Sequence, residues 1–123
     1  FAKVTIQARQ PLRGAALLAR FGLAGEAVPF GARLPDDARV LVNATSLGMA
    51  GQPDTALGLA PLPADASVYD LVYTPVRTPL LAAAEARALA TIDGLDMLIG
   101  QAALAFEIFF GAPPPDGAEE EAR

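Results

Sequence analysis

Short strand-like runs alternate with helix-like segments along most of the chain, and this order constrains the fold more than any other feature. In the first run, Val4 and Ile6 alternate with polar residues, whereas the longer segments repeat apolar residues at helical spacing. The predicted strands are residues 2–8, 26–30, 38–44, 67–73 and 91–92, and the predicted helices are residues 12–21, 79–90 and 94–111. This alternation predicts an α/β fold with a mainly parallel sheet, in which ligands bind beyond the carboxyl ends of the strands.

The composition excludes several classes of protein. Of the 123 residues, 53% are apolar and 19% are charged, which is typical of a domain with a buried core. Because cysteine and histidine are both absent, we expect no disulfide, no zinc site or other metal site, and no Ser-His-Asp triad. The net charge of −5 argues against nonspecific nucleic-acid binding, and no apolar run is long enough to span a membrane.

The run VLVNATSLGM, residues 40–49, ends an apolar strand in a cluster of polar side chains and a glycine. Asn43 lies at the end of the strand, Thr45 and Ser46 come directly after it, and Gly48 follows them. At the carboxyl end of a parallel strand, these groups can face a ligand crevice. A loop that satisfies its own backbone groups explains the same residues equally well, and the pattern leaves both readings open.

Two arginines flank the start of the first predicted helix. Arg9 leaves the first strand, Arg13 lies in the first helical turn, and residues 1–25 contain no acid. Both guanidinium groups can reach one anion near a helix N-terminus. In doubly wound nucleotide-binding folds, an arginine at the end of the second strand accommodates a 2′-phosphate. The alternative is two solvated surface arginines.

The last predicted helix is apolar on nearly every side, so we expect it to be buried or packed between two bodies. Gln101 interrupts that surface, and a buried amide needs a hydrogen-bond partner, either a neighbouring loop or a hydroxyl-bearing ligand. In the segment before the second helix, Tyr73 can donate to a substrate, whereas Asp70 is expected to cap backbone groups.

Taken together, these segments resemble the C-terminal NADP-binding half of the shikimate dehydrogenase family. The motifs that carry the resemblance occur in the family's order: ARQPLR (8–13), NATSLGM (43–49), YDLVYTPVRTPLL (69–81) and DGLDMLIGQAALAFEIFFG (93–111). The resemblance implies a Rossmann-like, doubly wound sheet in three layers. It also implies reversible hydride transfer between NADPH and 3-dehydroshikimate to give shikimate, a step of chorismate and aromatic amino-acid biosynthesis.

The resemblance also implies roles for individual residues. The cofactor-binding positions would be Arg9 and Arg13 at the 2′-phosphate, together with Thr45, Ser46, Leu71 and Gly94. The substrate-binding positions would be Tyr73 and Gln101. Ala8 and Gln10 depart from the asparagine and threonine that the family carries in its phosphate loop, which weakens the adenosine-side match, although both arginines remain.

Other parts of the family pattern do not occur in this sequence. The Gly-rich pyrophosphate loop and first strand are absent, and the catalytic lysine and aspartate belong to an N-terminal domain of the family. We therefore expect no catalytic residue in this chain and no turnover of shikimate by the chain alone. Without a first strand, the order 3-2-1-4-5-6 would separate the first two strands from the other three.

The predicted organisation is an incomplete NADP-binding domain over residues 1–111 and a flexible acidic tail over residues 112–123. The N-terminal catalytic domain is the implied partner, the implied location is cytoplasmic, and the resemblance allows a homodimer. A quinate-preferring relative, a non-catalytic NADP-binding module and a truncated chain that binds nothing are the alternatives that the sequence leaves open.

Overall fold

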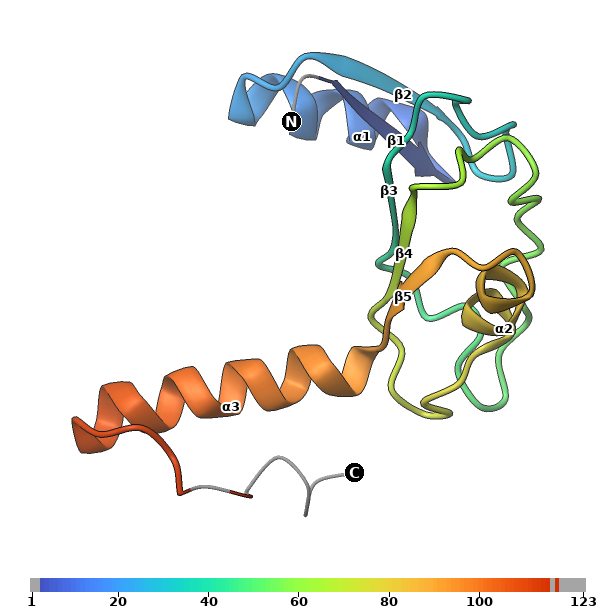
Figure 1. Ribbon diagram of the computed structural model, residues 1–123. Helices are drawn as coiled ribbons and strands as arrows, with labels where there is room; N and C mark the ends of the chain where they lie inside the picture. Colours follow the sequence, from blue (N-terminus) through green and yellow to red (C-terminus); the bar gives the residue numbers. More distant parts are fainter. Residues whose placement is uncertain (1–2, 116, 118–123) are drawn as a thin grey trace. The chain divides into compact units, whose positions relative to one another are not determined.

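A computed structural model describes residues 3–115 and 117, and its elements follow the predicted alternation (Figure 1). The strands are β1 (Val4–Ala8), β2 (Gly25–Pro29), β3 (Val40–Asn43), β4 (Ser67–Asp70) and β5 (Ala90–Ile92), and the helices are α1 (Pro11–Phe21), α2 (Pro79–Ala86) and α3 (Gly94–Phe110). All strand pairs among the described residues are parallel, and the α/β class is confirmed.

The chain divides into two compact units, of which the first runs to Asp37 and includes residues 56–62. In this unit β1 pairs with β2 from Val4 opposite Gly25 to Ala8 opposite Pro29, and α1 packs against both strands. A Cβ atom added to Gly14 would lie 3.0 Å from both Ala27 Cβ and Ile6 Cγ2, so this glycine lets α1 approach the sheet closely.

The second unit contains residues 38–55 and the chain from Pro63 onward. Its sheet has the order β3-β4-β5, and α2 packs against β4 and β5. Thr78 caps α2 by accepting a hydrogen bond from the Leu81 N–H, and Pro79 opens the helix. The core of this unit is apolar and includes Val68, Val72, Leu80, Leu81 and Ala84.

The two sheets share no strand pairing among the described residues. Strands β1 and β2 form one sheet, and strands β3, β4 and β5 form the other.

Helix α2 ends at Ala86, four residues before the predicted end of this helix at residue 90. Ala88 has a left-handed φ of 55°, and the Leu89 N–H bonds back to the Ala84 carbonyl. Leu89 is buried and β5 begins at the next residue, so the chain must leave the helix here. No glycine marks this helix end, and an alanine adopts the conformation that glycine adopts more readily.

Helix α3 begins at an Asp93 cap, whose side chain accepts from the Asp96 N–H at 2.9 Å, and ends at Gly111. The described chain does not bury this helix, because its large apolar side chains are largely uncovered, and the alternative of packing between two bodies stays a prediction. Leu104, Ile108, Phe109 and Phe110 are between 59% and 82% exposed. No helix in the described part of the chain combines the length and the apolar character needed to cross a membrane.

Val68 is fully buried in β4, at the centre of the second unit. Replacing it with alanine removes two methyl groups that no neighbour can replace, so we expect the free energy of unfolding to fall by about 1–3 kcal/mol. Urea denaturation of the wild type and the V68A variant measures this difference. Unchanged stability would contradict the placement of Val68 in the core.

Candidate functional site

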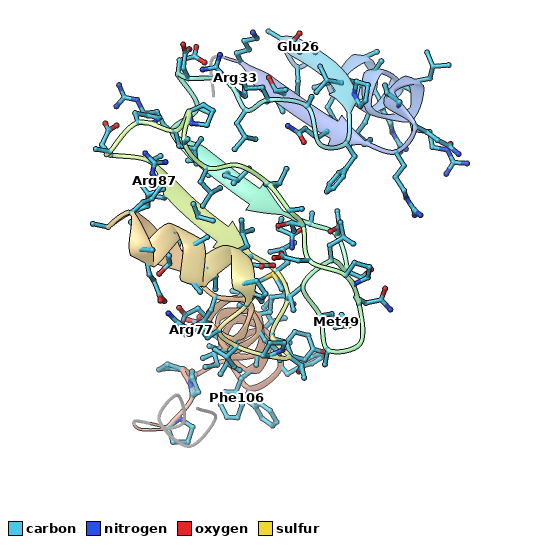
Figure 2. The ribbon with its side chains drawn as sticks, turned by 90° about the vertical axis from the view of Figure 1, so that its right-hand side faces the viewer. Glu26, Arg33, Met49, Arg77, Arg87 and Phe106 are labelled. Carbon is cyan, nitrogen blue, oxygen red and sulfur yellow. The ribbon has the colours of Figure 1, made fainter. Side chains whose placement is uncertain are left out.

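Asn43, at the end of β3, organises the loop that follows it. Its Oδ1 atom accepts hydrogen bonds from the Thr45 N–H at 3.1 Å and from the Thr45 hydroxyl at 2.8 Å. The Leu47 N–H in turn donates to Thr45 Oγ1 at 3.1 Å, and Asn43 Nδ2 donates to the Leu47 carbonyl at 3.0 Å. Asn43 and Thr45 therefore satisfy polar groups of the loop itself, as one of the two readings predicted. The same loop contains Met49 (Figure 2). Thr45 and Ser46 remain exposed at its surface.

Asp70, at the end of β4, is completely buried and accepts hydrogen bonds from three donors. Its Oδ1 atom accepts from Asn43 Nδ2 at 2.9 Å and from the Val72 N–H at 3.1 Å. Its Oδ2 atom accepts from the Thr78 hydroxyl at 2.7 Å. The predicted capping role is confirmed, and Asp70 in addition joins β3, the segment after β4 and the start of α2.

The segment after β4 is held from both sides. The Leu71 N–H donates to the Asn43 carbonyl at 3.0 Å. A Cβ atom on Gly94 would lie 2.5 Å from the Leu71 oxygen and 2.6 Å from the Val72 oxygen, so the start of α3 lies directly against this backbone. Tyr73, two residues further on, is 49% exposed.

Five of the predicted site residues therefore lie at one edge of the second unit. They are Thr45, Ser46, Leu71, Tyr73 and Gly94, and they come from the carboxyl ends of β3 and β4 and the start of α3. A further hydrogen bond, from the Ala50 N–H to the Thr74 carbonyl at 3.0 Å, ties the two loops together. This is the edge at which parallel sheets bind ligands.

The predicted anion site lies in the first unit, at the start of α1. Arg9, Arg13, Ala8 and Gln10 line an open pocket there. Neither guanidinium group is paired with an acid of the described chain, the first turn of α1 contains no acid, and the Gln10 side chain does not cap the helix. Pro11 has no N–H and the Arg13 N–H donates to the Gln10 carbonyl at 3.0 Å, so the donors available to an anion here are mainly the two guanidinium groups.

Gln101 lies on α3 and is exposed. The predicted burial of its amide is wrong for the described chain, in which no neighbouring loop bonds to its side chain. The alternative partner, a hydroxyl-bearing ligand, stays a prediction. Around it α3 presents apolar side chains, among them Phe106 (Figure 2), whose ring packs on Phe110 at 4.5 Å between centroids.

Sequence reasoning missed the bond between Asn43 and Asp70, and with it the link between the two loops. A capping aspartate and an Asx-type turn can each be predicted from nearby residues. Their mutual contact spans 27 positions and depends on the pairing of β3 with β4, which local patterns do not contain. Among residues 3–115 and 117, no cluster of three or more acidic side chains could hold a metal ion.

The fold defines a parallel α/β protein, a class in which ligands bind at the carboxyl ends of the strands. Residues 94–122 match the family model described as the shikimate 5′-dehydrogenase C-terminal domain. The chain is 66% identical over 121 residues to an NADP-dependent shikimate dehydrogenase of Sphingopyxis alaskensis, covering 98% of this chain and 44% of that protein.

Solved structures agree with this match. A shikimate 5-dehydrogenase from Thermus thermophilus, in complex with NADP(H) and shikimate, superposes with a TM-score of 0.79 at 39% identity, over 97% of this chain and 44% of that one. A quinate dehydrogenase from Corynebacterium glutamicum in complex with NAD gives a TM-score of 0.82 at 34% identity, over 98% and 45% of the two chains. The chain is similar over nearly its whole length to the C-terminal part of shikimate dehydrogenase family proteins, and it spans less than half the length of these relatives.

Proposed function

We propose that this chain forms the cofactor-holding part of an NADP-dependent shikimate dehydrogenase. The enzyme would transfer a hydride reversibly between NADPH and 3-dehydroshikimate to give shikimate. The relatives named above support this activity, and the chain's own residues support the choice of cofactor. The acid–base residues would lie in the N-terminal domain that the family carries.

The proposal rests on Arg9 and Arg13 at the start of α1, neither of which forms an ion pair with an acid of the described chain. NADP differs from NAD by a phosphate on the adenosine ribose, and arginine binds phosphate through two parallel hydrogen bonds. An acid at this place would instead favour the ribose hydroxyl of NAD. Because residues 1–25 contain no acid, the charges at this site favour NADP.

The other residues would line the path from the cofactor to the substrate. The exposed Thr45 and Ser46, the Leu71 backbone and the start of α3 at Gly94 form one wall at the strand ends. Tyr73, half-exposed beside that wall, could donate its hydroxyl proton to a substrate oxygen. We include Gln101 in the proposed substrate site because an exposed amide can both donate to and accept from sugar-like hydroxyls.

A quinate-preferring relative is the second candidate, and the similarity to a quinate dehydrogenase favours it. A third, a module that binds NADP without catalysis, would use the same arginines. Our proposal includes a cytoplasmic location, where NADPH is available to the enzyme, and a homodimer. Cell fractionation would check the location, and sedimentation analysis would check the dimer.

Steady-state rates of the full-length protein that carries this chain test the proposed function. Shikimate and quinate are each paired with NADP⁺ and NAD⁺, and shikimate with NADP⁺ is expected to give a kcat/KM ~10-fold or more above the other pairs. The chain of 123 residues alone is the control and should show no turnover. A preference for quinate would favour the second candidate, and NADP⁺ binding without turnover would favour the third.

A further inference from the structure

We propose that Asp70 is a positioning residue that holds both loops of the reaction site in one arrangement. The consequence for catalysis rests on the proposed function, whereas the coupling of the two loops rests on hydrogen bonds alone. Asp70 is fully buried, and its oxygens serve donors from three separate segments of the chain. These segments are the end of β3, the residues after β4 and the first residue before α2.

The Asp70 side chain, together with the Leu47 carbonyl, fixes the orientation of the Asn43 amide. Asp70 Oδ1 accepts hydrogen bonds from the Val72 N–H and from Asn43, so the NH₂ group of Asn43 faces this oxygen, at 2.9 Å. The amide oxygen of Asn43 then faces Thr45 and accepts from its N–H and its hydroxyl. A reversed amide would place two donors against Thr45, whose N–H would lose its acceptor.

The orientation set at Asp70 extends further along the loop. Because the Thr45 hydroxyl donates its proton to Asn43, its oxygen is free to accept from the Leu47 N–H. On the other side, Asp70 accepts from the Val72 N–H, next to Leu71 and before Tyr73. One buried side chain therefore orders the loop that carries Thr45 and Ser46 and also the segment that carries Leu71 and Tyr73.

Amide hydrogen exchange of the substrate-free, full-length protein tests this coupling directly. In D70A the exchange of the Thr45, Leu47 and Val72 amides is expected to accelerate by ~10-fold or more beyond any change in the control. The matched control is V68A, because Val68 lies two residues earlier in β4 and is equally buried but apolar. Faster exchange at Val72 alone would overturn the proposal, because Asn43 would then hold its loop without Asp70.

Kinetics supply the second readout. In D70A the KM values for NADP⁺ and for shikimate are both expected to rise and kcat/KM to fall by ~10-fold, because both loops lose their positions. V68A is expected to keep its kinetic constants even where its stability falls. A wild type that does not oxidise shikimate would refute the proposed function, while the exchange data would still decide the coupling.

Three further variants test the coupling of the two loops if D70A does not fold. In D70N the oxygen can still accept from Asn43 and Val72, and the new NH₂ group can donate to Thr78 Oγ1, so near-wild-type exchange is expected. T78V alone should leave exchange at Thr45 and Leu47 unchanged. In the double variant D70N/T78V the new NH₂ group has no hydroxyl acceptor at position 78. Exchange at the Thr45 and Leu47 amides should therefore rise. Equal exchange in T78V and the double variant would overturn the proposal.

Discussion

Replacing Arg9 and Arg13 together by glutamate is expected to raise the KM for NADP⁺ by about 100-fold or more and to leave the KM for NAD⁺ within about threefold. Both arginines line the pocket at the start of α1, and neither has an acidic partner in the described chain. Each would lose a charge-assisted bond to the 2′-phosphate, and each glutamate would repel it. NAD⁺ lacks that phosphate and loses nothing.

The matched control is R20E, which makes the same change of charge at the far end of α1. Arg20 lies in the last turn of the helix, with its guanidinium 5.7 Å from the centre of the Phe21 ring. R20E should leave both KM values close to those of the wild type. Steady-state kinetics of the full-length protein at two salt concentrations measure the effect, which should shrink at high salt for solvent-exposed charges. Equal loss of NADP⁺ and NAD⁺ binding would refute the arginine assignment.

The parts of the fold that could be predicted from the sequence are those specified by neighbouring residues. Pro11 opens α1, Thr78 and Pro79 open α2, and Gly22 and Gly111 end α1 and α3 in left-handed conformations. Each of these signals acts within one helical turn. The two arginines could be predicted for the same reason, because the start of the helix and both charges lie within five positions.

What the sequence did not reveal depends on contacts between distant segments. The bond from Asn43 to Asp70 forms only because β3 and β4 pair in a register that places these two residues opposite each other. The early end of α2 follows from the burial of Leu89 and the start of β5, not from a glycine. For α3, the apolar pattern predicted burial or packing between two bodies, and the described chain leaves Phe109 and Phe110 uncovered.

Replacing Gly94 with alanine is expected to lower the free energy of unfolding by about 3 kcal/mol or more and to reduce shikimate oxidation with it. The new Cβ atom would lie 2.5 Å from the Leu71 oxygen and 2.6 Å from the Val72 oxygen, which are backbone atoms and not flexible side-chain ends. That backbone cannot yield easily, because the Leu71 N–H is bonded to Asn43 and the Val72 N–H to Asp70. The methyl group must therefore displace either α3 or the segment that carries Tyr73.

G100A on the same helix separates this clash from the general effect of alanine in a helix. A Cβ atom on Gly100 would meet nothing within 4 Å in the described chain, so this change should stabilise α3 by about 0.5–1 kcal/mol through lower backbone entropy in the unfolded state. Urea denaturation of both variants should thus give shifts of opposite sign, and only G94A should also lower kcat/KM for shikimate. Because both changes add the same methyl group to one helix, a loss of stability of similar size in both would show that the close approach at Leu71 is not what requires glycine at position 94.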